Sequence, residues 1–193
     1  MDINVEKLAE RLAQRLFITQ NLRDIEMAKI QYGISLILGV IIEFTVVYAI
    51  SLILGFGFYT VVIMLSALFL RINTGGAHCS TYNRCVAFTA IYFLPFSALT
   101  KFINLYFSLK VEFITSILLY FIVFAIVREY KFYKIVISIS VILDTLLFFI
   151  GAAFGVKIFF IISISFILQS IMITPLGGMI VSRADSILKK LKI

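Results

Sequence analysis

The chain has 193 residues, of which 62% are hydrophobic and 14% are charged, and its formal net charge is +7. This balance argues against a water-soluble globular domain, whose core at this length needs far less apolar sequence. It predicts an all-α polytopic membrane protein, because about 20 apolar residues span a bilayer core about 30 Å thick. The basic residues are scattered between apolar runs and not clustered among aromatic ones, which argues against nucleic acid as a partner.

The first 30 residues are charged throughout and lack an apolar central run, so we expect no cleavable signal peptide. Apolar side chains recur at helical spacing within residues 2–17, at Val5, Leu8, Leu12 and Leu16. This pattern predicts an amphipathic N-terminal helix. Such a helix lies on the membrane surface or packs on the cytoplasmic ends of other helices, and both positions are compatible.

Six apolar runs follow, and each is predicted to cross the membrane. They lie at about residues 34–54, 57–70, 85–100, 113–127, 135–155 and 157–174. Pro95 falls inside the third run, where a membrane helix carries it at the cost of a kink. Pro175, with Gly177 and Gly178, is predicted to end the last helix. The expected organisation is one membrane domain over 1–193, with a cytoplasmic segment at 1–30, spans within 31–176 and a basic tail at 177–193.

The distribution of lysine and arginine predicts the orientation of these spans. Six spans place both termini on one side, and 14 of the 17 Lys and Arg residues fall on that side. Lys101, Lys110 and Lys157 are the three on the other side. Because cytoplasmic loops carry the excess of positive charge, both termini and residues 71–85 are predicted to be cytoplasmic in a multi-pass cell-membrane protein.

Residues 71–85 form a polar break that holds the chain's one histidine and both of its cysteines. Cys85 opens the third span, where the helix N-terminus, Arg84 and His78 are all expected to lower the pKa of its thiol. His78 would act as base or as imidazolium partner of a Cys85 nucleophile. Cys79 is a rival nucleophile, although as the neighbour of His78 it is expected to point elsewhere. From residue types alone, an inert structural histidine and cysteine remain equally open.

The spacing of His78 and Cys85 requires the chain to bend. In a straight helix their side chains would lie about 10 Å apart along the axis, at about 1.5 Å per residue, whereas proton transfer needs about 3 Å. Gly75 and Gly76 permit positive φ, and Ser80 is compatible with a turn, so a re-entrant loop that folds His78 over the helix start is predicted. Backbone amides at the helix start or at the double glycine are candidate donors to an oxyanion.

Neither a metal site nor a disulfide is expected in this break. Two cysteines and one histidine fall short of the four ligands of a structural zinc site, and no cofactor is predicted. A disulfide between Cys79 and Cys85 would be unusual in a loop that faces a reducing cytoplasm.

Arg71, the run from Gly75 through Gly76 and Ala77 to His78, and Cys85 resemble the signature of the accessory gene regulator B (AgrB-like) family. These are membrane cysteine peptidases of Gram-positive quorum sensing, and six spans with cytoplasmic termini and an amphipathic start are similar to that family. The resemblance implies His78 and Cys85 as the catalytic pair, a functional role for Arg71, and a homodimer.

The same resemblance implies a reaction and a partner. The C-terminal tail of an AgrD-like signal-peptide precursor would be cleaved through a thioester on Cys85. An internal Cys or Ser of the peptide would then attack, releasing a thiolactone or lactone. The connector at 128–134 is shorter here than in some relatives, so their recognition of the precursor tail does not carry over residue by residue.

Several charged or polar residues outside the break have both a functional and a structural interpretation. Arg128, Lys131 and Lys134 are candidates for contact with an acidic precursor tail, or they only set topology. Asp144 is a candidate to orient His78, although its depth in the fifth span argues for a hydrogen-bonded structural role, as for Glu43 in the first span. Gln169 is expected to join helices.

Two other functions remain open on the sequence. A small transporter or exporter would use Glu43, Asp144 and Lys101 as a polar path, with the His/Cys loop as its gate. A non-catalytic membrane assembly factor would tolerate substitutions in the loop.

Overall fold

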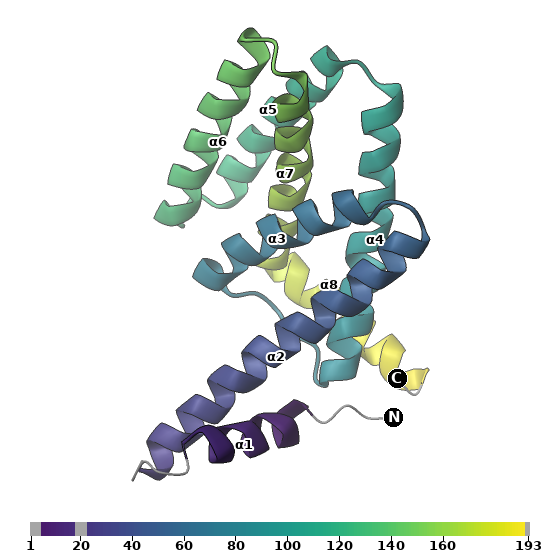
Figure 1. Ribbon diagram of the computed structural model, residues 1–193. Helices are drawn as coiled ribbons and strands as arrows, with labels where there is room; N and C mark the ends of the chain where they lie inside the picture. The colour runs from purple at the N-terminus through teal and green to yellow at the C-terminus, as the bar shows by residue number, and fades with distance from the viewer. Residues whose placement is uncertain (1–4, 18–22, 192–193) are drawn as a thin grey trace.

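The computed structural model describes residues 5–17 and 23–191, and this part of the chain contains helices but no strand (Figure 1). The predicted all-α class is confirmed. The described helices are α1 (Val5–Leu16), α2 (Asp24–Ile53), α3 (Gly57–Thr74), α4 (Tyr82–Tyr106), α5 (Leu109–Ile126), α6 (Lys131–Phe149), α7 (Ala153–Met172) and α8 (Pro175–Lys190).

Within the described residues, six helices, α2 to α7, are long and apolar enough to cross a membrane. The predicted multi-pass membrane protein is therefore confirmed, although some bounds differ from the predicted ones. The fifth span ends at Phe149 and not near residue 155, because the chain turns at Ile150 and Gly151. Lys157 consequently lies inside α7, where its Nζ donates to the Asn104 carbonyl at 3.1 Å.

Pro175 begins a helix in addition to ending one. It occupies the first turn of α8, where its missing N–H costs nothing. The Thr174 side chain caps this helix by accepting from the Gly177 amide at 3.4 Å. A Cβ at Gly177 would lie 2.5 Å from the Ile171 carbonyl oxygen, so only glycine fits this tight turn between α7 and α8. The predicted basic tail is thus mostly an ordered amphipathic helix.

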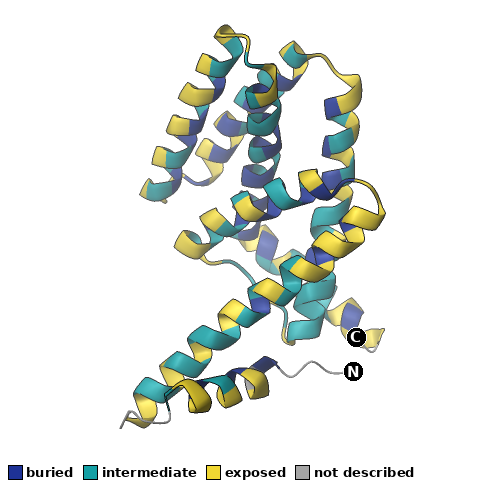
Figure 2. Ribbon diagram, in the orientation of Figure 1, coloured by how far each residue is buried: buried dark blue, intermediate teal, exposed yellow. Residues whose placement is uncertain are grey.

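Helix α7 is the centre of the molecule, and it packs against α3, α5 and α6 (Figures 1 and 2). Tyr120, Tyr133 and Phe166 lie in a buried cluster formed by α5, α6 and α7 with the end of α3. The outward faces of the spans are apolar and exposed, for example at Phe121 and Ile142. In a spanning protein, such faces are covered by lipid and not by further protein.

Helix α1 confirms the predicted amphipathic segment from Val5 onward, whereas residues 2–4 lie outside the described residues. It lies along the N-terminal half of α2 and buries a face of small residues, with Ala9 and Ala13 nearly inaccessible (Figure 1). Leu8 and Leu16, two of the residues that predicted the apolar face, remain exposed. Helix α1 therefore packs on another helix and still presents leucines that a membrane surface can take up.

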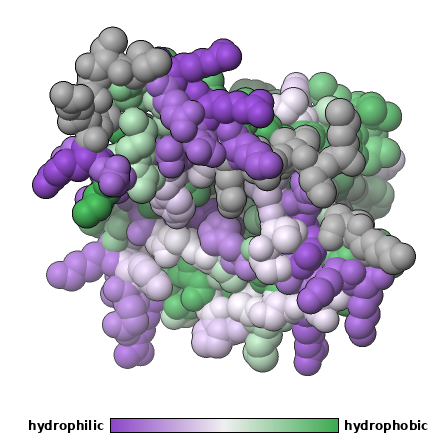
Figure 3. Space-filling model, turned by 90° about the horizontal axis from the view of Figure 1, so that it is seen from below, coloured by the Kyte–Doolittle hydropathy of each residue, from purple (hydrophilic) through white to green (hydrophobic). Residues whose placement is uncertain are grey.

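Hydrophilic residues gather on the lower end of the molecule, as the view from below shows (Figure 3). Helices α1 and α8 lie at this end (Figure 1). Helix α4 also begins at this end, directly after the connection that carries His78 and Cys79 (Figure 1). This polar end is consistent with one aqueous side for the loop, and its assignment to the cytoplasm stays a prediction.

Candidate active site

Helix α3 ends at Thr74, and residues 75–81 cross to α4 without regular structure. Gly75 has φ +71° and Gly76 has φ +154°, conformations that side-chain-bearing residues rarely adopt. These two glycines let the chain leave α3 abruptly and turn His78 toward the helix it has just left. The spacing of His78 and Cys85, together with the double glycine, predicts a bend here.

Arg71, in the last turn of α3, holds the returning segment. Its Nη2 donates to the Ala77 carbonyl at 3.1 Å and lies 3.1 Å from Nδ1 and 3.2 Å from Nε2 of His78. A guanidinium only donates, so the ring nitrogen that faces it accepts and is unprotonated. The contact therefore favours the neutral imidazole.

The electrostatics of His78 agree with that geometry. Its surface is largely accessible in the isolated chain, yet nearby protein atoms partly desolvate the ring. This desolvation, followed by the positive charge of Arg71, lowers the pKa of His78 below its usual value. At neutral pH the side chain is consequently a base and not a preformed imidazolium partner.

Gln169 of α7 fixes the beginning of the loop. Its Nε2 donates to the Gly75 carbonyl at 3.2 Å, while the side chain itself is buried. We had expected Gln169 to join helices, and it instead attaches the loop to the central helix. A Cβ at Gly76 would meet the Arg71 guanidinium at 3.6 Å and this amide at 3.7 Å, so the loop is closely fitted between α3 and α7.

The two cysteines are free thiols and both are half-buried. Burial, followed by the neighbouring Cys85, raises the pKa of Cys79 to about 11. No hydrogen bond joins His78 to Cys85 in the described part of the chain, where the imidazole contacts Arg71 instead.

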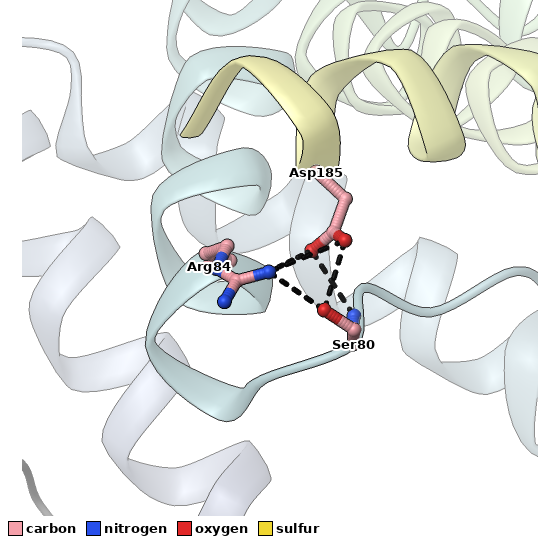
Figure 4. A network of polar contacts seen from close by, with 3 residues as sticks. All are labelled: Ser80, Arg84 and Asp185. Carbon is pink, nitrogen blue, oxygen red and sulfur yellow. Dashed lines mark hydrogen bonds and ion pairs between the residues drawn. The ribbon is translucent and has the colours of Figure 1, made fainter. Parts of the chain in front are cut away.

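Asp185 of α8 bonds to the bend between the two cysteines (Figure 4). Its carboxylate accepts from the Ser80 amide at 3.1 Å and from the Ser80 hydroxyl at 2.8 Å. Arg84 Nη1 donates to the same carboxylate at 3.2 and 3.3 Å and to the Ser80 hydroxyl oxygen at 2.7 Å. The charge of Arg84, which was expected to favour a Cys85 thiolate, is thus offset by Asp185, a residue that sequence reasoning missed.

A cavity of about 90 Å³ lies beside His78 between α2, α3, α4 and α7. Glu43 lines it and accepts a hydrogen bond from the Thr89 hydroxyl. The Arg71 side chain and Gln169 line the same polar end. The other walls are apolar and comprise Val40, Phe44, Met64, Ala67, Leu68 and Phe93.

Asp144 does not join this group. It is buried on α6, and its carboxylate accepts a hydrogen bond from Ser116 of α5. The sequence had offered Asp144 as the carboxylate that orients His78, but it is Glu43 that lines a cavity with the histidine. Both carboxylates are mid-helix in the sequence, so only the packing of the helices distinguishes them.

The basic connector lies next to the loop. Arg128 and Lys131 are exposed, and Lys134 Nζ lies 5.8 Å from the centre of the Phe124 ring. A second cavity, of about 340 Å³, is lined by Tyr130 of the connector, by Gly76 and Ala77 of the loop, and by the α7–α8 turn. The structure therefore places the connector and the loop on one open depression.

The sequence features of the accessory gene regulator B family match residues 5–173, which run from the start of α1 through the end of α7. The chain belongs to the accessory gene regulator B family. Helix α8, with Asp185, lies beyond the matched residues. Membership supports a role for this membrane protein in an accessory gene regulator system of quorum sensing.

Individual relatives match a smaller part of the chain. Accessory gene regulator protein B of Staphylococcus intermedius is 34% identical over 85 residues, which cover 44% of this chain and 43% of the relative. An AgrB-like protein of Listeria innocua is 33% identical over 93 residues, 46% of each chain. One of Listeria monocytogenes is 33% identical over 89 residues, 45% of this chain and 44% of the relative. The chain thus aligns with less than half the length of these relatives, and no solved structure matches it.

Proposed function

We propose that this AgrB-family chain is a membrane cysteine endopeptidase that removes the C-terminal tail of a quorum-sensing precursor peptide. Cys85 is the nucleophile, and His78 is the base and then the acid. The observation that carries the proposal is the folding of residues 75–81, which holds a neutral, Arg71-bound imidazole beside a cavity that α4 also lines. Cys85 lies in the first turn of that helix.

The chemistry follows from these protonation states. His78 takes the proton of the Cys85 thiol, and the thiolate attacks the scissile carbonyl to form a tetrahedral oxyanion. His78 then gives that proton to the leaving amine, which departs with the tail and leaves a thioester on Cys85. Substrate binding must bring His78 from Arg71 to Cys85, as in many sites whose catalytic hydrogen bonds form only with substrate bound.

The second half-reaction makes the ring. An internal Cys or Ser of the peptide loses its proton to His78 and attacks the thioester, forming the thiolactone or lactone and regenerating the Cys85 thiol. Holding both ends of the peptide close favours this attack over hydrolysis. A half-buried Cys85 at the membrane surface also limits the access of water to the thioester.

Roles for the surrounding residues follow from their contacts. Arg71 positions His78, and the two positive-φ glycines allow Arg71 to reach it. Amides at the start of α4 or at the double glycine are the oxyanion donors, whereas the Ser80 amide is already bonded to Asp185 and is assigned to positioning.

Two cavities supply places for the peptide. The apolar cavity beside His78 takes the side chain that precedes the scissile bond, because its walls are apolar and the base lies in its wall. The open depression between Tyr130 and the loop takes the departing tail. An acidic tail there would meet the charges of Arg128 and Lys131.

The transporter alternative gains no support from the packing. Lys101 Nζ donates to the Gly55 carbonyl at 3.0 Å, Glu43 bonds to Thr89, and Asp144 bonds to Ser116. These three charged side chains are each committed to a different contact, and of the three only Glu43 lines the cavity beside His78. Cytoplasmic termini and a homodimer remain part of the proposal.

The test is cleavage of a candidate precursor peptide in proteoliposomes, with mass spectrometry of the protein to trap the acyl-enzyme. Cys85→Ala and His78→Ala should abolish cleavage, Cys79→Ala should retain it, and the adduct should map to Cys85. Cleavage at the wild-type rate in both the Cys85→Ala and the His78→Ala variant would exclude the proposed catalytic pair.

A further inference from the structure

The most extensive polar network in the described chain outside the Arg71–His78 contact joins α8 to the bend of the catalytic loop (Figure 4). The Asp185 carboxylate accepts hydrogen bonds from the amide and hydroxyl of Ser80 and from the guanidinium of Arg84. The side chains of Arg84 and Asp185 are only 13% and 20% exposed, so this ion pair is shielded more than an ordinary surface pair. Hydrogen bonds from Ser80 and Arg84 hold the pKa of Asp185 below its usual range, and the group is ionised at neutral pH.

The position of these contacts along the chain gives them a consequence for the site. Ser80 directly follows Cys79 and lies two residues after His78. Arg84 directly precedes Cys85. By bonding to both Ser80 and Arg84, Asp185 holds together the two ends of the bend that the spacing of His78 and Cys85 requires.

The carboxylate is itself held in place by a fixed helix. The Thr174 cap and the tight turn at Gly177 set the direction in which α8 leaves α7. Val181 and Leu188 are buried, and α8 packs against α4. Asp185 lies between these two buried residues, so it meets the bend from a rigid support and not from a mobile tail.

We propose that Asp185 is a positioning residue, which holds the Ser80–Arg84 bend and thereby fixes the start of α4, with Cys85, relative to the loop that carries His78 for the peptidase reaction. The inference rests on the proposed function for its consequence in catalysis, but the geometric part stands on the contacts alone. Asp185 touches neither reacting atom. Its removal therefore acts on the arrangement of the catalytic pair, and a misplacement of about 1 Å costs about 100-fold in rate.

The experiment compares Asp185→Asn with Asp24→Asn, the same chemical change at an exposed position near the start of α2. Asp185→Asn should lower kcat for precursor cleavage between about 10-fold and 100-fold with KM within about 2-fold of wild type. Asp24→Asn should keep both constants. A rise in KM at unchanged kcat would mean that Asp185 binds substrate, and it would overturn the positioning role.

A double-mutant cycle tests whether Asp185 acts through Arg84. If both residues serve one contact, Asp185→Asn combined with Arg84→Gln should lose little more kcat than the worse single variant. Fully multiplicative losses would contradict the shared contact. Arg84→Gln combined with Asp24→Asn provides the additive control.

A readout without substrate separates this inference from the proposed function. The rate of Cys85 alkylation by iodoacetamide, followed by mass spectrometry of the full-length protein in detergent, should rise about 5-fold or more in Asp185→Asn, because the released bend no longer covers the thiol. Trypsin cleaves after Arg84 and so places Cys79 and Cys85 on different peptides. If the alkylation rate in Asp185→Asn equals that of the wild type, the positioning role is overturned, even if the wild type cleaves its peptide. If alkylation rises as expected but the wild type cleaves no peptide, only the peptidase function is overturned.

Thermal unfolding of each variant shows whether it is folded. If Asp185→Asn does not fold, Ser80→Ala takes its place, because it removes the hydroxyl that donates to Asp185 and accepts from Arg84 and leaves the Arg84–Asp185 ion pair. Ser80→Ala should also raise the alkylation rate of Cys85, by a smaller factor than Asp185→Asn. An unchanged rate would refute the proposal.

Discussion

At the scale of single residues, the decisive feature is that His78 is held neutral. Partial desolvation and the Arg71 guanidinium both lower its pKa, and the same guanidinium contacts its ring nitrogens. Arg84, whose charge was expected to help ionise Cys85, is paired with Asp185. Of the three groups that were expected to favour a Cys85 thiolate, Arg84 and His78 are therefore less effective, and only the N-terminus of α4 is unchanged. Transfer of the Cys85 proton to His78 consequently becomes a step of the proposed reaction.

The first prediction concerns the pH dependence of that step. Because His78 works as a base, kcat/KM should fall when the pH drops through its pKa, and this lowered pKa places the acid limb below that of an ordinary imidazole. Arg71→Gln removes the positive charge that lowers the pKa, so the acid limb should move to higher pH. Arg71→Lys keeps the charge and should move it less. An acid limb that stays in place in Arg71→Gln would show that His78 is not the titrating base.

At the scale of the elements, the site depends on how two connections leave their helices. The α3–α4 loop turns back on positive-φ glycines and is bonded to α7 through Gln169. The α7–α8 turn depends on the close approach of Gly177 to the backbone of residues 171 and 172. The α3–α4 loop and helix α8, which follows the α7–α8 turn, meet where Asp185 bonds to Ser80.

The second prediction uses neighbouring glycines of α8. A Cβ at Gly177 would lie 2.5 Å from the Ile171 carbonyl oxygen, so Gly177→Ala must displace the helix and should cost about 1–3 kcal/mol of stability. Gly178 has no atom within 4 Å of the added Cβ, and Gly178→Ala should be neutral or stabilise by up to about 1 kcal/mol. Thermal unfolding in detergent compares the two variants, and equal melting temperatures would contradict the tight turn.

The third prediction concerns the cavity beside His78. Ala67 of α3 is 3% exposed and lines it, so Ala67→Phe fills the space. Cleavage of precursors with a bulky apolar residue before the scissile bond should fall about 10-fold to 200-fold in kcat/KM, and precursors with a small residue there should be affected less. Ala125→Phe, on the exposed face of α5, is the matched control. An equal loss for both classes of precursor would remove the cavity from substrate selection.

At the scale of the whole molecule, the central α7 and the lipid-facing apolar surfaces explain why few polar residues are needed in the spans. Two of the carboxylates there are hydrogen-bonded, Glu43 to Thr89 and Asp144 to Ser116, whereas the buried Glu112 carboxylate of α5 has no hydrogen-bond partner among the described residues. An unpaired carboxylate in the bilayer is costly, so these pairs are first of all a condition for spanning the membrane.

The fourth prediction concerns orientation. In a variant without native cysteines, Ser186→Cys on α8 should react with a membrane-impermeant maleimide only from the cytoplasmic side, and Lys110→Cys at the start of α5 only from the outside. Both native positions are exposed, which makes the labelling comparison direct. Labelling of both from the same side would contradict the six-span arrangement with cytoplasmic termini.

The sequence by itself determined the properties that are local in the chain. Runs of apolar residues set the membrane class and the number of spans, because the length of a helix and its hydropathy depend on consecutive residues. The bend was likewise indicated locally, by the spacing of His78 and Cys85 and by the double glycine between α3 and α4. The end of the fifth span was misplaced, because Gly155 is apolar enough to continue a span while the turn lies at Gly151.

Only the tertiary structure decided which distant residues meet. Asp185 is 105 residues from Ser80, and its place in a basic C-terminal stretch gives no sign of that contact. Glu43 and Asp144 look alike in the sequence, yet only Glu43 faces a cavity shared with His78. The physical reason is that contacts between helices depend on which faces pack together, and this is fixed jointly by side chains of several helices and not by any one segment.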